Sequence, residues 1–185
     1  MIRTWLLTST TYGTWLPGDR RGFVSTVKED SGPRVRHNVP GTAVDADIPG
    51  LRQSARKLLK CPPILLNEEQ AVAVVHQFRE TAAYRNWQLL AAAVMSNHFH
   101  LVVAAEESIP STILLRDFKS YASRALNSKW MKPASGTWWT ESGSRRPLPD
   151  ERAVEAAIEY VRHQPNPLAL WIASDNNPER GASAP

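Results

Sequence analysis

Cysteine and long apolar runs are nearly absent from the sequence. The single cysteine, Cys61, cannot form an internal disulfide, and it excludes a cysteine-rich zinc site. No apolar run approaches the roughly 20 residues that a membrane-spanning helix needs. The apolar part of the N-terminus is too short for a signal peptide. We therefore expect a cytoplasmic protein with no membrane partner.

A strong excess of one charge is also missing. The chain has 22 Lys and Arg residues against 18 Asp and Glu, which gives a net charge of +4. This excess permits a polyanionic partner but does not require one. The chain has 185 residues, of which 42% are hydrophobic and seven are tryptophan. It is therefore long and apolar enough to bury a core and is not a disordered chain.

The domain organisation follows from where the composition changes. We expect a single domain over residues 1–174, with a long irregular excursion at about 28–62 and a flexible tail over 175–185. The excursion is polar and punctuated by glycine and proline, with a short helix expected within 51–60. A loop of this length inside a compact domain is unusual and often functional.

The remaining segments alternate between strand and helix patterns. Residues 3–12 read as a first strand, and residues 88–105 as two strands joined around 95–97 or one long bent strand. Asn67 and Gln70 form a capping-box pattern before a helix with apolar residues at 71, 74, 75, 78 and 82. A second helix starts at 110–111, with Leu114, Phe118, Tyr121 and Ala125 on one stripe.

The C-terminal part continues the alternation. Residues 136–148 read as a strand or a β-hairpin, and Asp150 caps a last helix that Pro165 and Pro167 stop. The whole order predicts an α+β sandwich, with helices packed on a central antiparallel sheet.

Two histidines stand out within the apolar run MSNHFHLVV, residues 95–103. Side chains alternate along a strand, so His98 and His100 point to one face and Phe99 to the other. Two imidazoles about 7 Å apart on a strand can converge on one metal ion, although they cannot fill its coordination sphere. The alternative is one exposed histidine and one that makes a hydrogen bond in the core.

The last helix carries a second polar pair. Its apolar stripe is Val154, Ala157, Ile158 and Val161, and Tyr160 and Gln164 lie four residues apart on the flank of that stripe. A phenol and an amide in this position can reach a sheet face. The alternative is a half-buried tyrosine and a surface glutamine near a helix end.

Taken together, VMSNHFHLVV (94–103) and EYVRHQPNP (159–167) resemble the single-tyrosine HUH transposases. This family includes insertion-sequence transposases and their REP-associated relatives. The similarity extends to residues 10–24, 118–127 and 137–148, so it covers most of the chain.

The resemblance implies an RRM-like or ferredoxin-like fold and a nucleoid-associated prokaryotic enzyme. Such an enzyme cleaves single-stranded DNA at a hairpin-flanked site and rejoins it through a 5′-phosphotyrosine. His98, His100 and the Gln164 carbonyl would bind a divalent ion, and Tyr160 would be the nucleophile. Mixed nitrogen and oxygen ligands with open positions suit Mg²⁺ or Mn²⁺, although zinc could bind too.

Three alternatives stay open at this point. Tyr121 also follows the histidines on a helix, but it falls on an apolar stripe and has no amide or carboxylate four residues later. The chain could instead be a non-catalytic module that binds single-stranded nucleic acid on the same fold. It could also be a metal-dependent nuclease that uses water as its nucleophile.

Basic and aromatic residues supply candidate DNA contacts. The expected phosphate contacts are Arg20, Arg21, Lys119, Arg124, Arg145 and Arg146. Because Trp138 and Trp139 alternate, one of them should face the core, and we expect Trp138 to be able to stack on a base. For each residue the alternative is a solvated arginine or a core tryptophan. Either a monomer or a homodimer fits, and the prolines after Gln164 favour a monomer because they leave little helix to exchange.

Overall fold

The structure is a computed structural model that describes residues 1–20, 26–28, 34–36 and 47–173. The C-terminal tail predicted from residue 175 lies outside the described residues. The elements in chain order are β1 (Ile2–Thr10), β2 (Thr26–Lys28), β3 (Arg34–Arg36), α1 (Pro49–Lys57), α2 (Glu68–Tyr84), β4 (Gln88–Val94), β5 (His98–Glu106), α3 (Ser111–Lys129), β6 (Ser144–Leu148), α4 (Glu151–Arg162) and β7 (Ala169–Ile172).

The main sheet has five strands in the order β6-β1-β5-β4-β7, and all of its pairings are antiparallel. Without β7, the elements β1-α2-β4-β5-α3-β6 in the strand order β6-β1-β5-β4 are those of a ferredoxin-like sandwich. The predicted α+β class is therefore confirmed. The short strand β7 was missed by the sequence analysis, and it adds to the free edge of β4 through Ala91–Val94.

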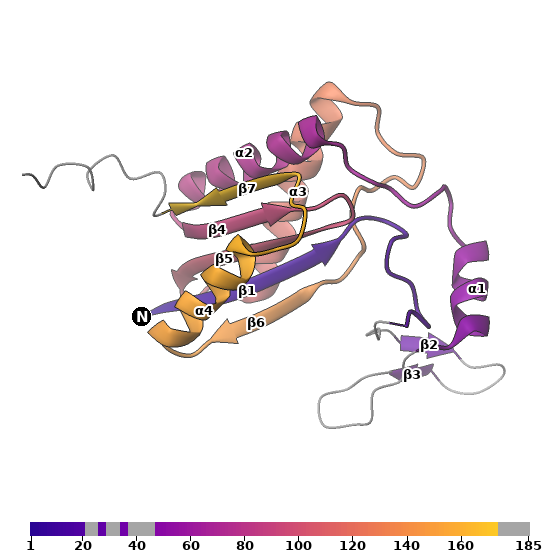
Figure 1. Cartoon of the computed structure of the whole chain (residues 1–185), viewed down its shortest axis with the longest axis horizontal. Helices are drawn as coiled ribbons and strands as arrows, with labels where there is room; N and C mark the ends of the chain where they lie inside the picture. Colours follow the sequence, from indigo (N-terminus) through magenta and orange to yellow (C-terminus); the bar gives the residue numbers. More distant parts are fainter. Residues whose placement is uncertain (21–25, 29–33, 37–46, 174–185) are drawn as a thin grey trace, which may run out of the picture.

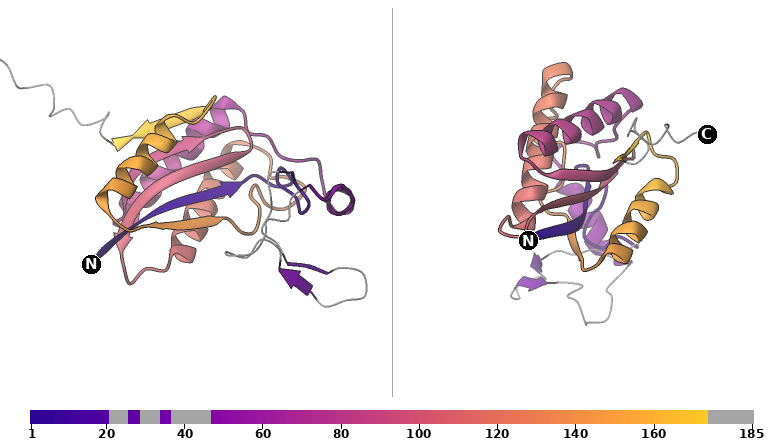
Figure 2. Two further views of the ribbon diagram at one scale, coloured as in Figure 1. Left: turned by 60° about the horizontal axis from the view of Figure 1, so that its bottom comes forward. Right: turned by 90° about the vertical axis from the view of Figure 1, so that its left-hand side faces the viewer.

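Helices α2 and α3 cover one face of this sheet (Figures 1 and 2). The predicted apolar stripe of α2 is buried, and Phe78 packs edge-on against Phe99 of β5 and Phe118 of α3. The capping box predicted at the start of α2 is also present, because Asn67 and Gln70 exchange side-chain to backbone hydrogen bonds. This side of the sheet holds the larger of the two cores.

Helix α4 lies alone on the opposite face (Figure 2). Its predicted stripe is confirmed: Ala157 and Val161 are buried, and they pack with sheet residues that include Ala91, Ala93 and Val102. The helix begins where predicted, because the Asp150 side chain accepts a hydrogen bond from Ala153 N at 2.8 Å. It ends at Arg162, two residues before Gln164.

The buried stripe of α3 differs from the predicted one. Leu114 and Phe118 are buried as expected, but the stripe continues through Ala122 and Leu126. Tyr121 and Ala125 lie at its edge and are only partly buried. The buried residues are thus spaced four positions apart throughout, along one row of the helix surface, and α2 contacts this row at Phe118 through Phe78.

The long excursion contains regular elements where it is described. β2 pairs with β3 in a separate two-stranded ribbon, and α1 confirms the short helix expected within residues 51–60. Helix α1 lies beside the sandwich, not on the sheet (Figure 1). The end of the excursion is joined to the sandwich through Tyr12, which directly follows β1. The Tyr12 hydroxyl accepts a hydrogen bond from Lys60 N, and its carbonyl oxygen accepts one from Ile64 N. Among the described residues, no helix is long and apolar enough to span a bilayer.

The cap of α4 provides a test of how this helix is fixed. Asp150→Ala should lower the free energy of unfolding by about 1 kcal/mol, because it leaves the Ala153 N–H without its side-chain acceptor. Asp150→Ser keeps an acceptor and should retain most of the stability. Urea denaturation followed by tryptophan fluorescence measures both variants, and an equal loss in the two would contradict the capping role.

Candidate active site

The two histidines lie on the face of the sheet that α4 covers. β5 is paired with β1 on one side and β4 on the other, so His100 sits between Thr8 and Ala93. His100 lies on the same face of the sheet as Val102, which packs against α4. Phe99 points to the other face, into the core under α2 and α3. The imidazole centroids of His98 and His100 are 5.0 Å apart. The prediction that both rings share one face is confirmed.

Tyr160 reaches this pair from α4. Its hydroxyl oxygen is 3.4 Å from Nε2 of His100, and the two ring centroids are 5.1 Å apart. Tyr160 is also 50% exposed, so its side chain is accessible to a second molecule. The fold therefore joins a tyrosine and a histidine that are 60 residues apart in the chain.

Nδ1 of each histidine has a hydrogen-bond partner. Nδ1 of His98 is 2.6 Å from Oδ1 of Asn97, and Nδ1 of His100 is 2.7 Å from Oγ1 of Thr8. Neither Asn97 nor Thr8 was predicted from the sequence as a partner of the histidines. Asn97 could have been found from its place directly before His98, but Thr8 becomes visible only once the pairing of β1 with β5 is known.

His100 is uncharged at neutral pH. Burial and, to a smaller extent, the neighbouring His98 together lower the pKa of its imidazole from 6.5 to about 4. His100 is only 6% exposed. A neutral imidazole has a lone pair that can bind a metal ion, but an imidazole with a pKa near 4 is a weak base for a phenol whose ordinary pKa is near 10.

Gln164 lies next to Tyr160 at the end of α4. Its Nε2 donates a hydrogen bond to the carbonyl oxygen of Tyr160 at 3.0 Å, which anchors the amide one turn after the tyrosine. Its Oε1 accepts no hydrogen bond from the described part of the chain. Within the described residues Gln164 makes no hydrogen bond with His98 or His100, so its role as a ligand remains a prediction.

The donor set limits which metal ions fit. No group of three or more His, Cys, Asp or Glu side chains is close enough to hold an ion within the described ranges. The nitrogens of the two imidazoles would therefore need oxygen ligands from an amide, from water or from a bound phosphate to complete a metal site. Such a mixed and incomplete set fits Mg²⁺ or Mn²⁺ with positions left for substrate.

The predicted arginine contacts are divided between the two faces of the sheet. In β6, Arg146 pairs with Leu6, and Ser144 pairs with Thr8, so both lie on the face of the histidines. Arg145 lies on the opposite face, beside α3. Arg145, Arg146 and Arg20 are exposed. Arg21 lies outside the described residues.

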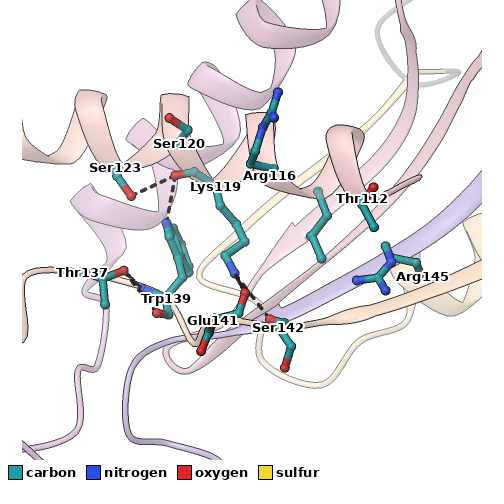
Figure 3. A pocket seen from close by; sticks show the side chains of 11 residues that line it. Thr112, Arg116, Lys119, Ser120, Ser123, Thr137, Trp139, Glu141, Ser142 and Arg145 are labelled. Carbon is teal, nitrogen blue, oxygen red and sulfur yellow. Dashed lines mark hydrogen bonds between the residues drawn. The ribbon is translucent and has the colours of Figure 1, made fainter. Parts of the chain in front are cut away.

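Lys119 lines an open groove between α3 and residues 137–145, on the face opposite the histidines (Figure 3). Its Nζ donates hydrogen bonds to the carbonyl oxygens of Thr140, Glu141 and Ser142. Burial lowers the pKa of Lys119 to about 8, while the charge of Glu141 acts in the opposite direction and that of Arg145 adds a smaller lowering. The expected phosphate contact is thus replaced by a structural one, in which the ammonium group ties this segment to α3.

Trp138 is not a base-stacking residue in this structure, and that prediction is wrong. Both Trp138 and Trp139 are buried, at 5% and 2% exposure. The alternation rule fails because this segment is not a regular strand; only Trp139 forms an isolated bridge, with Thr11. The Trp138 indole instead donates a hydrogen bond to Asn127 of α3 at 2.9 Å.

Tyr121 does not lie beside the histidines, where a nucleophile would be needed. It belongs to α3, on the opposite face of the sheet, and its ring centroid is 6.1 Å from that of Tyr84. The guanidinium of Arg124, another predicted phosphate contact, stacks over the Tyr121 ring at 5.0 Å. Of the two candidate tyrosines, Tyr160 is the one that the fold brings to the histidine pair.

The sequence matches one family model over more than half of its length. The model is described as "Transposase IS200 like", and it matches residues 63–164. This range includes both histidines, Tyr160 and Gln164. No curated protein is significantly similar in sequence.

Two solved structures align with the chain at low sequence identity. One is a REP-associated tyrosine transposase bound to a REP hairpin, with 13% identity, a TM-score of 0.45, and coverage of 86% of this chain and 64% of that one. The chain thus spans about two thirds of the length of that protein. The other is a candidate transposase from Deinococcus radiodurans R1, with 14% identity, a TM-score of 0.45, and coverage of 89% and 92%.

The buried neutral state of His100 predicts how stability depends on pH. Its folded pKa, about 4, lies below the unfolded value of 6.5. As the pH falls from 6.5 to 4, the unfolded chain takes up the proton first, so the free energy of unfolding should fall. The contribution of His100 to the free energy of unfolding is fully present above pH 6.5. It is lost as the pH falls to 4, and the loss amounts to about 3 kcal/mol.

Urea denaturation of the metal-free protein in EDTA, at several pH values between 7.5 and 4.5, measures this effect. His100→Gln should flatten the dependence between pH 6.5 and 4.5. If the free energy of unfolding depends on pH in the same way in the wild type and the variant, the pKa of His100 is not lowered in the folded protein.

Proposed function

The chain belongs to the IS200-like transposase family, and from this premise we propose that it cleaves and rejoins single-stranded DNA with Tyr160 as the nucleophile. The observation that carries the proposal is the 3.4 Å approach of the Tyr160 hydroxyl to Nε2 of His100, beside His98. A half-exposed phenol next to two imidazoles on one sheet face supports a role as nucleophile, because the phenol is accessible to a phosphodiester and lies beside candidate activating groups.

The proposed reaction is a transesterification. The Tyr160 oxygen attacks the phosphorus, a new phosphorus–oxygen bond forms, and the bond to the 3′ oxygen of the DNA breaks. The proton lost by the phenol is balanced by the proton gained by the 3′ hydroxyl. The product is a 5′-phosphotyrosine, and because no water is consumed, a 3′ hydroxyl of a second strand can reverse the step.

His98 and His100 would hold a divalent ion, Mg²⁺ or Mn²⁺, with the Gln164 carbonyl as a further ligand. Such an ion, when bound, polarises the scissile phosphate and favours departure of the 3′ oxygen. The low pKa of His100 supports this role, because a buried neutral imidazole is a better ligand than a base for a phenol. The Gln164 side chain lies close to Tyr160, because its amide donates a hydrogen bond to the Tyr160 carbonyl oxygen.

The proposed substrate is single-stranded DNA flanked by a hairpin. Arg146 and Arg20 are exposed and free to meet phosphates. Arg146 shares the face of the histidines, so we assign it to the strand that enters the site. Arg124 and Arg145, on the α3 side, would contact DNA that passes around the other face.

We also propose that a single chain forms a complete site. Tyr160 and His100 of the same chain already approach within 3.4 Å, so no second copy is needed to supply the tyrosine. Two prolines follow Gln164 within three residues, which leaves α4 no helical extension for exchange between copies.

Covalent trapping tests the nucleophile. The protein is incubated with a single-stranded hairpin DNA labelled at its 3′ end, the end that stays on the tyrosine, together with Mn²⁺ or Mg²⁺, and the products are separated on a denaturing protein gel. The wild type and Tyr121→Phe should form a labelled adduct, whereas Tyr160→Phe should form none, because only Tyr160 lies beside the histidine pair.

Each other outcome identifies a different function. Cleavage that survives Tyr160→Phe without any adduct would indicate a nuclease that uses water. DNA binding without cleavage in the wild type would indicate a non-catalytic binding module. An adduct lost in Tyr121→Phe and kept in Tyr160→Phe would reverse the assignment of the nucleophile.

The position of Arg146 on the histidine face gives a second test. Arg146→Ala should weaken binding of the single-stranded DNA and reduce the salt dependence of the affinity, with the slope of log K against log salt falling by about 0.7 for one lost phosphate contact. Fluorescence anisotropy at several salt concentrations measures both quantities. Arg152→Ala, an exposed change near the far end of α4, serves as a charge-matched control. Equal losses in the two variants would show that only net charge matters.

A further inference from the structure

We propose that α1 is a second DNA-binding element, which contacts the phosphates of a duplex segment, the stem of a hairpin in the substrate DNA. The inference concerns a surface outside the histidine site, and it rests on the proposed function only for the nature of the substrate. Helix α1 (Pro49–Lys57) lies outside residues 63–164, the range that matches the transposase family model. Its role therefore has to follow from its own side chains and contacts.

The surface of α1 is strongly basic. Arg52, Arg56 and Lys57 lie on the helix, Lys60 follows it, and all four side chains are exposed. No acidic residue occurs between residues 48 and 67. A basic last turn by itself stabilises a helix through its dipole, but Arg52 and Lys60 lie outside that turn. The charge therefore extends along the whole segment, as in a surface that binds a polyanion.

The cations of α1 are unpaired, in contrast to other arginines of the protein. Arg85 and Arg116, beside α3, are ion-paired with the buried Asp117 at 2.6 and 2.9 Å. None of the four cations of α1 forms an ion pair within the part of the chain that the structure describes. Their charge is thus available to phosphates, whereas that of the α3 arginines is partly neutralised.

The apolar face of α1 is turned toward the protein itself. Leu51, Ala55 and Leu59 recur every four residues, and each of them is partly buried. The side of the helix that faces solvent is polar apart from Leu58. An amphipathic helix that lies on a membrane buries its apolar face among the lipids. Because that face of α1 is already packed, the exposed face fits a nucleic acid and not a lipid surface.

Both ends of α1 are fixed to the segment that follows β1. At the start, Ile48 N donates a hydrogen bond to Gly18 O at 3.1 Å. Gly18 has a φ of +83°, and a Cβ on it would lie 2.7 Å from Arg52 N and closer still to the Ile48 carbonyl oxygen, so this position requires glycine. Just after the helix, Lys60 N donates to the Tyr12 hydroxyl at 2.8 Å. A helix held in this way presents its charges in one arrangement, which lowers the entropy lost on binding.

This docking places α1 beyond the end of the sheet at which His98 lies. Thr10, the last residue of β1, pairs with His98, and Tyr12 follows two residues later. Strand β1 runs toward α1 (Figure 1). A stem bound along α1 would therefore lie next to the histidine end of the sheet, and its single-stranded flank would enter the site where Tyr160 is proposed to act.

The composition of α1 favours a duplex over a single strand. Proteins that bind single-stranded DNA combine positive charge with aromatic side chains on which the bases stack. Residues 49–60 contain no aromatic residue. Arg52 and Arg56 are four residues apart, so they lie about 6 Å apart along one row of the helix. The segment thus supplies a row of charges for a regular phosphate backbone and no surface for unpaired bases.

Fluorescence anisotropy of the full-length protein with two labelled DNA probes tests the inference. One probe is a hairpin without single-stranded flanks, and the other is a single strand of the same length that forms no hairpin. Arg52→Gln/Arg56→Gln should bind the hairpin about tenfold more weakly at 0.1 M salt, and the slope of log K against log salt should fall by about 1.8 for two lost phosphate contacts. Its affinity for the single strand should stay nearly unchanged.

A second double variant controls for the loss of charge. Lys132→Gln/Arg152→Gln removes the same charge from two exposed positions outside α1 and should bind the hairpin as the wild type does. Glutamine has a high helix propensity, so the substitutions in α1 should leave the helix intact. Circular dichroism and thermal melts establish that each variant is folded before it is titrated.

A pair of glycine variants tests the docking of α1. Gly18→Ala introduces a Cβ that collides with the start of the helix, so it should displace α1 and weaken hairpin binding severalfold. Gly50→Ala lies within α1, where a Cβ meets no atom within 4 Å, and it should bind the hairpin as the wild type does. Hairpin binding by Gly18→Ala that equals that of the wild type would overturn the role of the docking.

The outcomes separate failure of this inference from failure of the proposed function. If Arg52→Gln/Arg56→Gln binds the hairpin as tightly as the wild type, or no more weakly than the control double variant, α1 is not the stem-binding element. Equal weakening for the two probes would overturn the assignment to duplex DNA. If the wild type binds the hairpin through α1 but forms no Tyr160 adduct with saturating substrate, the proposed function fails and the inference stands.

Discussion

The antiparallel pairing of β1 with β5 is the constraint on which the site depends. It runs over nine residue pairs, from Ile2 with Glu106 to Thr10 with His98, in the middle of the sheet. A slip of one residue would turn both imidazoles from the α4 face into the apolar core under α2 and α3. The register also places Thr8 against His100. The strand pairing that holds the sheet together thus also sets the geometry of the histidines.

The two faces of the sheet serve different purposes. The face under α2 and α3 holds the larger core, with Phe78, Phe99 and Phe118 in mutual contact. The face under α4 is covered by one short helix, and its smaller core leaves the end of β5 at His98 partly open. Polar side chains can be kept on this face because the apolar burial that stabilises the fold is largely provided by the other one.

Much of the fold could be predicted because its signals are local. The capping box at Asn67 and the cap at Asp150 depend on residues three positions apart, and the shared face of the histidines depends on one strand alone. The failures have a different origin. Trp138 was assigned from alternation in a segment that forms no regular strand, and the position of Tyr121 depends on how α3 packs against α2.

The same distinction applies within the site. His98 and His100 are recognisable from nine consecutive residues, and Tyr160 and Gln164 from a helix pattern together with the family resemblance. The contact between Thr8 and His100 joins residues 92 positions apart, so no local pattern could indicate it. The groove beside Lys119 is equally non-local, since it depends on how residues 137–145 return along α3. Contacts of this kind are properties of the tertiary structure.

The site is rigid on one side and accessible on the other. The histidines belong to a central strand hydrogen-bonded on both sides, and His100 is almost fully buried. Tyr160 projects from a helix of 12 residues and is half exposed. Fixed ligands keep a metal site in one geometry, because reorganisation during the reaction would cost free energy. In the proposed reaction, Tyr160 would have to admit a phosphodiester between itself and the histidines and then remain attached to one end of the DNA. A tyrosine on a short helix, held to the sheet by a weak 3.4 Å contact, meets both requirements.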